Sequence, residues 1–214
     1  MYFALSIVVE HAQVAQVCSP DGAFLREGTT LLDMLPEFVF DKPYPIVSAK
    51  VNNVSQGLKF RVYNNRDVEF TDATVPSGMR VYNRSLFFLI CKAAHDVFRG
   101  SRLYVEHPIS HGYYCELRKA DGSKTTADDV EKIKARMQSM VARDMNFHRF
   151  EVQTEEAIRI FREKGYEDKA RLLETSGQVY MDYYTLGRTA DYYYGRLVPS
   201  TGYLKVWDLK LFHE

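Results

Sequence analysis

Three residues of metal-binding type recur at equal spacing in the middle of the chain: His107, His111 and Cys115. On one face of a helix, imidazole and thiolate groups at this spacing would form a metal site. Pro108 and Gly112 rule out a regular helix here, so the three side chains need not converge. We therefore interpret the stretch as a polar loop with a buried cysteine, and we expect no metal site.

A second group of chemically interesting side chains is rich in tyrosine. Its members are Tyr180, Tyr183, Tyr184, Tyr192, Tyr193 and Tyr194. Such rings can stack on nucleobases. Tyrosines on neighbouring strands more often pack against one another across the strands, with their hydroxyl groups exposed to solvent. Arg188 and Arg196 flank the group and could meet a phosphate. An ion pair with Asp182 or Asp191 is the alternative for these two arginines.

The sequence identifies no catalytic centre. It offers no Ser/His/Asp set, no Cys/His pair and no paired carboxylates that the residue pattern alone would define as catalytic. Asp128, Asp129 and Asp144 are interpreted as helix caps or surface groups. The chain contains no Gly-Lys dipeptide, which a phosphate-binding P-loop requires, so that chemistry is excluded from these residues.

Composition limits the partners and the compartment. The formal net charge of the 214 residues is zero, whereas nucleic-acid binders usually carry a basic excess. RNA binding therefore has no support from the overall charge, although a local basic face stays open. Cys18, Cys91 and Cys115 have no paired spacing, which indicates reduced thiols and a cytoplasmic protein. Residues 1–9 are too short to cross a membrane, and we expect a strand or a disordered leader there and no membrane partner.

The first third of the chain predicts short strands around one short helix. Asp21-Gly22 suggests a hairpin between residues 14–18 and 23–26. Thr30 is a helix N-cap signal before Leu31, and Pro36 keeps that helix short. Further strands are expected at residues 46–51, 58–62, 67–70 and 78–82, which together indicate an α+β roll.

The pattern changes at Asn83, where a helix that is apolar on nearly every side begins and runs to Gly100. Thr126 and Asp129 form a capping-box signal for an amphipathic helix. Two shorter helices are expected from Thr154 and over residues 166–173. The strands expected in this part are residues 103–106, 113–117, 147–152, 179–184, 191–194 and 203–211.

The residues from about 13 to 82 resemble a TGS domain, the β-grasp module of threonyl-tRNA synthetases, some GTPases and stringent-response enzymes. The resemblance is carried by Asp21-Gly22, Gly28-Thr29-Thr30-Leu31-Leu32, Ala49-Lys50-Val51-Asn52-Asn53 and Ser77-Gly78-Met79-Arg80-Val81. It implies a β-grasp domain, which we place at residues 1–82.

The residues from 83 to 214 resemble the second additional, editing-type domain of threonyl-tRNA synthetase. The matching segments are His111-Gly112-Tyr113-Tyr114 with Glu116, then Asp129-Val130-Glu131, Arg136-Met137, Glu156-Ala157, Phe161, Gly165, Lys169 and Val198-Pro199-Ser200-Thr201-Gly202. The resemblance implies an α+β editing-type domain. His111 and Tyr113 in the matching hairpin, together with Arg188 and Arg196 beside the tyrosines, are candidate ligand contacts.

The same resemblance argues against hydrolysis. In such domains two histidines on the first helix face a Cys-x-x-x-His before the Val-Pro turn. Here the four positions hold Arg84, Phe88, Tyr193 and Leu197. None of these side chains is a good ligand or base at neutral pH, so we expect a degenerate site without catalytic residues. Since a buried arginine needs a partner, we expect Arg84 to approach Asp191 or the Tyr193 hydroxyl group.

The combination also resembles bacterial proteins in which these two domains precede a uridine kinase-like domain. That resemblance implies that this chain is a non-catalytic accessory region and that its partner is an attached kinase domain. ATP and Mg²⁺ would bind to the kinase domain, and no cofactor is expected in this chain. One alternative is an aminoacyl-ester hydrolase with a site rebuilt from His95, His107, His111 or Cys115. The other is a stand-alone RNA-binding or regulatory module.

Overall fold

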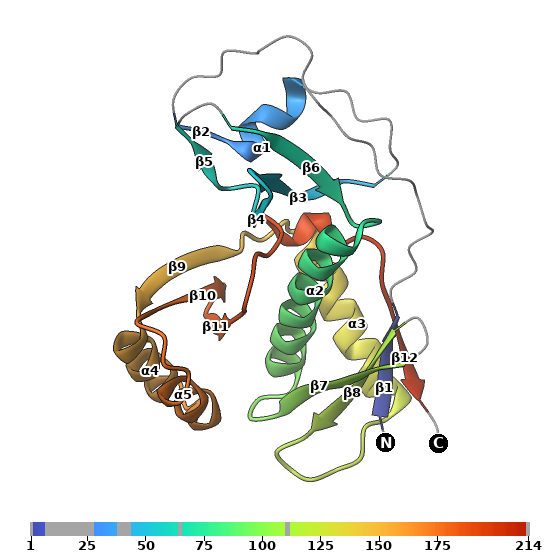
Figure 1. Ribbon diagram of the computed structural model, residues 1–214. Coiled ribbons are helices and arrows are strands. Elements are labelled where there is room, and N and C mark those ends of the chain that lie inside the picture. Colours follow the sequence, from blue (N-terminus) through green and yellow to red (C-terminus); the bar gives the residue numbers. More distant parts are fainter. Residues whose placement is uncertain (1, 7–27, 38–43, 64–65, 110–111, 213–214) are drawn as a thin grey trace. The chain divides into compact units, whose positions relative to one another are not determined.

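The computed structural model describes residues 2–6, 28–37, 44–63, 66–109 and 112–212 (Figure 1). The chain forms two compact units. The first comprises Met1–Met145 and Arg196–Glu214, and the second comprises Asn146–Gly195. Within the described residues every pair of neighbouring strands is antiparallel, and the helices pack beside these sheets instead of linking parallel strands, so the α+β prediction is confirmed.

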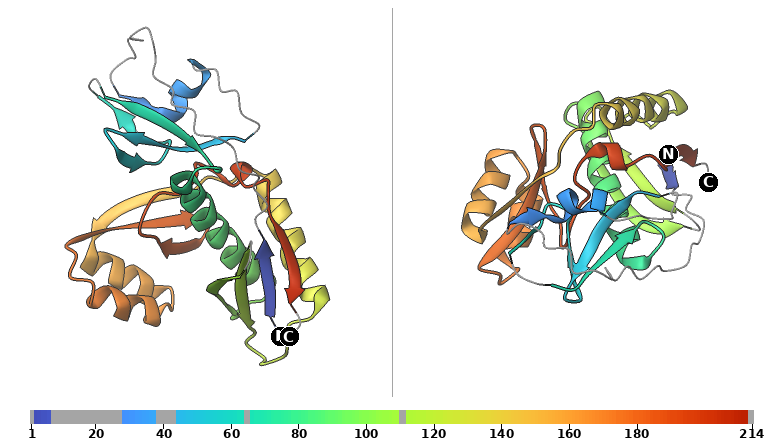
Figure 2. Two further views of the ribbon diagram at one scale, coloured as in Figure 1. Left: turned by 45° about the vertical axis from the view of Figure 1, so that its right-hand side comes forward. Right: turned by 90° about the horizontal axis from the view of Figure 1, so that it is seen from above.

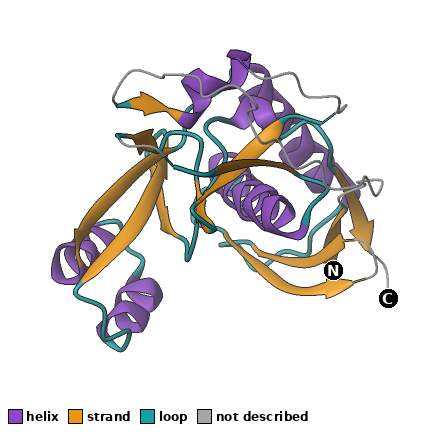
Figure 3. Ribbon diagram, turned by 45° about the horizontal axis from the view of Figure 1, so that its top comes forward, coloured by secondary structure: helices purple, strands orange, loops and turns teal. Residues whose placement is uncertain are grey.

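A four-stranded antiparallel sheet with the order β12-β1-β8-β7 forms one part of the first unit. Its strands are β1 (Tyr2–Ser6), β7 (Arg102–Ile109), β8 (Gly112–Arg118) and β12 (Asp208–Phe212). Figure 3 shows helices α2 (Pro76–Val97) and α3 (Ala127–Ala142) on one side of this sheet. Of the two alternatives considered for residues 1–9, a strand or a disordered leader, the structure has a strand over Tyr2–Ser6, which pairs with β8 and β12.

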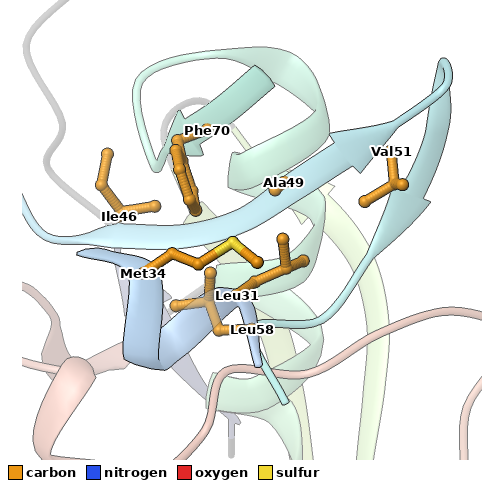
Figure 4. Packing of buried hydrophobic residues seen from close by; sticks show 7 residues of the cluster. All are labelled: Leu31, Met34, Ile46, Ala49, Val51, Leu58 and Phe70. Atoms are coloured by element: carbon orange, nitrogen blue, oxygen red, sulfur yellow. The ribbon is translucent and has the colours of Figure 1, made fainter. Parts of the chain in front are cut away.

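Residues 28–72 hold the described elements of the expected β-grasp domain. These are β2 (Thr29–Thr30), α1 (Leu31–Met34), a 3-10 turn (Leu35–Glu37), β3 (Ile46–Val51), β4 (Val54–Gln56), β5 (Arg61–Val62) and β6 (Val68–Asp72). Strands β4, β3 and β6 form one sheet, and β2 pairs with β5. Figure 4 shows their shared core of Leu31, Met34, Ile46, Ala49, Val51, Leu58 and Phe70. Burying these apolar side chains is the main force that holds the small sheet to α1.

The helix cap and the turn predicted from short sequence motifs in this region are both present. The Thr30 hydroxyl group accepts a hydrogen bond from the Asp33 amide at 3.2 Å, which completes the expected cap of α1. Asn52 and Asn53 both have positive φ and form the tight turn between β3 and β4. The hairpin expected around Asp21-Gly22, and Cys18, lie outside the described residues.

The strand expected at residues 78–82 is wrong. These residues form the first turns of α2, which begins at Pro76 rather than near Asn83. Proline is suited to the first helical position, because its fixed φ fits the helix and its missing N–H needs no partner there. Val81 and Tyr82 are neighbours and both are buried, so the apolar pattern reflects a helix enclosed on several sides. The domain boundary predicted at residues 82 and 83 falls inside this continuous helix.

The second unit is a small α+β layer. Strands β9 (His148–Gln153), β10 (Tyr180–Leu186) and β11 (Thr189–Tyr192) form a sheet with the order β11-β10-β9. Helices α4 (Thr154–Glu163) and α5 (Glu167–Glu174) pack on one face of it (Figure 2). The core between them contains Ala157, Phe161, Ala170, Leu173, Met181 and Ala190.

A substitution at Gly78 tests how closely the first turns of α2 pack against the end of β6. A Cβ atom at this position would lie 1.8 Å from the Asp72 carbonyl oxygen, so any side chain must displace backbone. We expect Gly78→Ala to lower the free energy of unfolding by about 3 kcal/mol in urea titrations. Gly57→Ala is the matched control, because its added Cβ would meet its nearest atoms at 3.6 Å. Equal effects of the two substitutions would contradict this packing.

The cap of α3 predicts a dependence of stability on pH. Burial pushes the pKa of the Asp129 carboxyl group up, but the hydrogen bonds from Lys119 and Thr126 outweigh it and leave the pKa lowered. A lowered folded-state pKa contributes stability that is complete above the unfolded pKa of about 4 and is lost as the pH falls through the folded pKa. Asp129→Asn should therefore destabilise the protein at pH 7 and flatten the loss of stability below pH about 4. The exposed neighbour Asp128, which pairs with Lys132, supplies the comparison Asp128→Asn, which should cost less stability than Asp129→Asn in urea titrations at pH 7.

Candidate functional site

Three of the four positions that the resemblance assigns to a degenerate editing site lie in the first unit. Arg84 and Phe88 are one turn apart on α2, and Leu197 follows the return of the chain at Arg196. Phe88 is fully buried and Leu197 is 4% exposed. Two positions that would hold polar ligands in a hydrolytic site are thus part of the hydrophobic core.

Hydrogen bonds hold residues 196–198 against α2. The Val198 amide donates to the Ser85 hydroxyl oxygen at 2.9 Å, and that hydroxyl group donates to the Val81 carbonyl oxygen at 2.7 Å. The Arg84 Nε donates to the Arg196 carbonyl oxygen at 3.3 Å. We call this contact the α2 seam: Arg84, Ser85 and Phe88 on the helix, with residues 196–198 beside them.

Further contacts continue the attachment after the seam. The Thr201 hydroxyl group donates to the Met140 carbonyl oxygen at 2.6 Å and accepts from the Met145 amide at 2.8 Å. The Tyr82 hydroxyl group donates to the Val206 carbonyl oxygen and accepts from the Val206 amide. Burial raises the pKa of Tyr82 to about 12, so this hydroxyl group stays neutral. The chain from residue 196 to 206 is thereby fixed to both α2 and the end of α3.

The seam lacks the chemistry of hydrolysis. Phe88 and Leu197 have no lone pair to bind a metal ion or to orient water, and the Arg84 guanidinium is a permanent donor. The Ser85 hydroxyl group is engaged with two backbone groups in a buried position. Sequence reasoning missed the roles of Ser85 and Thr201, because their contacts with Val198 and Met140 join segments that lie far apart in the sequence.

Tyr193, the fourth position that the resemblance assigns to such a site, lies in the second unit. Its hydroxyl group donates to Asp191 Oδ2 at 3.3 Å, and Lys169 Nζ lies 2.5 Å from Asp191 Oδ1. A lysine, a carboxylate and a phenol thus meet at the edge of the β11-β10-β9 sheet. Because Arg84 and Asp191 belong to different units, the expected approach of Arg84 to Asp191 or Tyr193 stays a prediction.

The tyrosines divide into packed and exposed rings. Tyr183 and Tyr192 are cross-strand partners, and both meet the Phe161 ring edge-on. Tyr184 is buried, whereas Tyr180 and Tyr194 are 58% and 65% exposed. The expected cross-strand packing is confirmed for Tyr183 and Tyr192.

The two flanking arginines take different places. Arg188 is exposed in the turn between β10 and β11, and its carbonyl oxygen accepts from Lys164 Nζ at 3.5 Å. Arg196 is half-buried in the α2 seam. Asp182 pairs with Arg149 at 2.7 Å and Asp191 with Lys169.

The candidate metal ligands lie on different surfaces. The His107 ring stacks on Tyr114, whose neighbour Cys115 is fully buried. Successive residues of a strand point to opposite faces, so His107 and Cys115 do not converge. His95 is exposed near the end of α2, and His111 lies outside the described residues. Within the described ranges, no group of three or more His, Cys, Asp or Glu side chains is placed to hold a metal ion.

Tyr113 has a defined environment in the first unit. Its hydroxyl oxygen accepts a hydrogen bond from Asn83 Nδ2 at 3.1 Å, and its ring meets Phe87 edge-on. In the part of the chain that the structure describes, no helix has the length and apolar character needed to span a membrane.

The fold is an α+β module, and comparison with known proteins relates the chain to tRNA synthetases. The chain is 31% identical to a threonine–tRNA ligase of Carboxydothermus hydrogenoformans over 157 residues, which are 73% of this chain and 23% of that protein. It is 28% identical to the threonine–tRNA ligase of Rubrobacter xylanophilus over 92% of its own length and 30% of that protein. The threonine–tRNA ligase of Geobacillus kaustophilus shows the same identity and the same two shares.

These similarities show that most of the chain resembles one region of threonyl-tRNA synthetases. The chain spans less than a third of the length of the curated relatives it matches. No family model matches the sequence. The relatives give no support to a nucleoside kinase.

The Ser85 hydroxyl group tests the seam directly. Ser85→Ala would leave the buried Val198 amide without its acceptor, which costs about 1–3 kcal/mol. We expect a loss of this size in the free energy of unfolding from urea titrations. Ser55 is exposed on β4, and Ser55→Ala should change stability by less than about 0.5 kcal/mol. A neutral Ser85→Ala variant would show that residues 196–198 are not fixed by this bond.

Proposed function

We propose that this chain is a non-hydrolytic, tRNA-synthetase-related module that binds tRNA without cleaving an aminoacyl ester. The observation that carries the proposal is the burial of Phe88 and Leu197 at two former editing positions. A hydrolytic site needs groups that activate water and space for the ester. The α2 seam offers neither, because its polar atoms are used to hold the backbone together.

Binding, rather than a purely structural role, is supported by the character of the relatives and by the second unit. The relatives are named threonine–tRNA ligases, and an RNA of that type is the natural candidate ligand. The second unit presents the exposed arginine Arg188, next to which Lys164 reaches the turn between β10 and β11. Cations at an exposed turn suit phosphate oxygens.

A rebuilt hydrolase is the less favoured candidate. It would use His95, His107, His111 or Cys115, but His107 and Cys115 lie on opposite faces of the sheet and His95 is exposed near the end of α2. The accessory role for an attached uridine kinase, with ATP and Mg²⁺, rests on the resemblance of the sequence alone. A cytoplasmic location remains part of the proposal.

Two measurements test the proposed function together. A threonine tRNA that carries a noncognate amino acid should lose it at the same rate with the protein as in buffer. The same tRNA should bind in a fluorescence anisotropy titration at low salt. Ester hydrolysis that rises with protein concentration would overturn the non-hydrolytic assignment, and absence of binding at 50 mM salt would overturn the tRNA assignment.

Arg188 supplies a variant for the binding assay. If its guanidinium contacts a phosphate, Arg188→Gln should weaken binding of tRNA and reduce the slope of log Kd against log salt by about 1. Arg159, an exposed arginine on α4, gives the matched control Arg159→Gln, which should leave the slope unchanged. Identical slopes for the two variants would remove Arg188 from the interface.

A further inference from the structure

One face of the four-stranded sheet in the first unit displays a row of ring side chains. Cys115 and Leu117 on β8 and Leu209 on β12 are buried on the face that packs toward α2 and α3. Because side chains alternate along a strand, Tyr114, Glu116 and Arg118 point to the other face. We call this the outer sheet face, and in the described part of the chain no helix covers it (Figures 1 and 3).

The rings on this face contact one another across the strands. The His107 ring stacks on Tyr114 with centroids 5.1 Å apart and an interplanar angle of 24°. Tyr114 meets Phe212 edge-on at 5.9 Å. These contacts connect β7, β8 and β12 and hold three rings in fixed places, so a ring that stacks on them loses little protein entropy on binding.

Guanidinium groups accompany the rings. Arg118 Cζ lies 4.5 Å from the centroid of the Tyr104 ring, and Glu116 Oε2 accepts from Arg118 at 2.6 Å. Arg102 is the direct register partner of Arg118. Like charges placed opposite each other on a sheet repel, and Glu116 relieves part of that repulsion through Arg118. A phosphate oxygen beside the two guanidinium groups would relieve more of it. The edge of the outer sheet face near Arg102 and Arg118 is therefore suited to a phosphate.

The other charged residues of the outer sheet face determine how much of the affinity would come from stacking and how much from charge. Asp208 is paired with Lys134 at 2.6 Å, and Lys210 lies 3.9 Å from the same carboxylate. Glu106 is a further exposed carboxylate on β7. With acids and bases in balance over the face as a whole, stacking on the rings would supply most of the affinity and the arginine pair a smaller part.

We propose that the outer sheet face binds single-stranded RNA, with bases stacked on Tyr114, His107 and Phe212 and a phosphate near Arg102 and Arg118. Open four-stranded sheets that present aromatic rings are suited to unpaired bases. A protein partner fits less well, because Phe212 is the one large hydrophobic residue of β7, β8 and β12 that is exposed in the described residues. The proposal uses no residue of the α2 seam and does not depend on the proposed function.

The test is a fluorescence anisotropy titration with a labelled eight-nucleotide single-stranded RNA at 50 mM salt. Wild-type protein should bind it and should bind a duplex of the same length more weakly. Tyr114→Ala should weaken binding about tenfold, which lies within the range for loss of one base stack. Tyr114→Phe retains the stacking ring and should bind like wild type. Arg118→Gln should reduce the salt slope by about 1.

Tyr180→Ala is the matched control, because Tyr180 is an exposed tyrosine on a strand of the second unit. It should bind the oligonucleotide like wild type, and circular dichroism melts should confirm that each variant is folded. Equal binding by Tyr114→Ala and Tyr180→Ala, or a duplex bound as well as the single strand, would overturn the proposal. So would a dimer in sedimentation that dissociates on Tyr114→Ala, since a second copy would then be the occupant of the face.

Discussion

The hydrogen bond from the Val198 amide to the Ser85 hydroxyl group joins segments that lie 113 residues apart in the sequence. It fixes the chain where it returns from the second unit, since residues 146–195 are inserted between Met145 and Arg196. The Arg84 and Tyr82 contacts extend the same attachment along α2. Strand β12 begins at Asp208, after residues 196–206, and pairs with β1, so the closure of the four-stranded sheet depends on this return.

This constraint also explains the chemistry of the seam. Buried backbone groups need partners, and the side chains of Ser85 and Arg84 supply them. Apolar side chains at Phe88 and Leu197 then exclude water and strengthen those bonds. The polar tetrad of an editing site would have to remain open to water and substrate, which is the opposite requirement. A structural joint and a hydrolytic cleft are therefore alternative uses of the same helix face.

Sequence reasoning succeeded where the signal is local. The capping boxes at Thr30 and Thr126 and the Asn52-Asn53 turn are each determined by a few adjacent residues. It failed at residues 78–82, because burial of α2 on several sides removes the period that separates helix from strand. The sequence predicted only part of the seam. A resemblance drew attention to Phe88 and Leu197, whereas the Ser85 contact joins distant segments and has no local signature.

Amide hydrogen exchange at Val198 under native conditions tests the central claim most directly. If residues 196–198 are fixed to α2 in a closed seam, the Val198 amide should exchange only through large-scale unfolding. Its protection should then match that of the buried α2 residues Leu89 and Ile90. Exchange as fast as that of an exposed loop amide would contradict the account, because the seam would then open to water and could serve as a site.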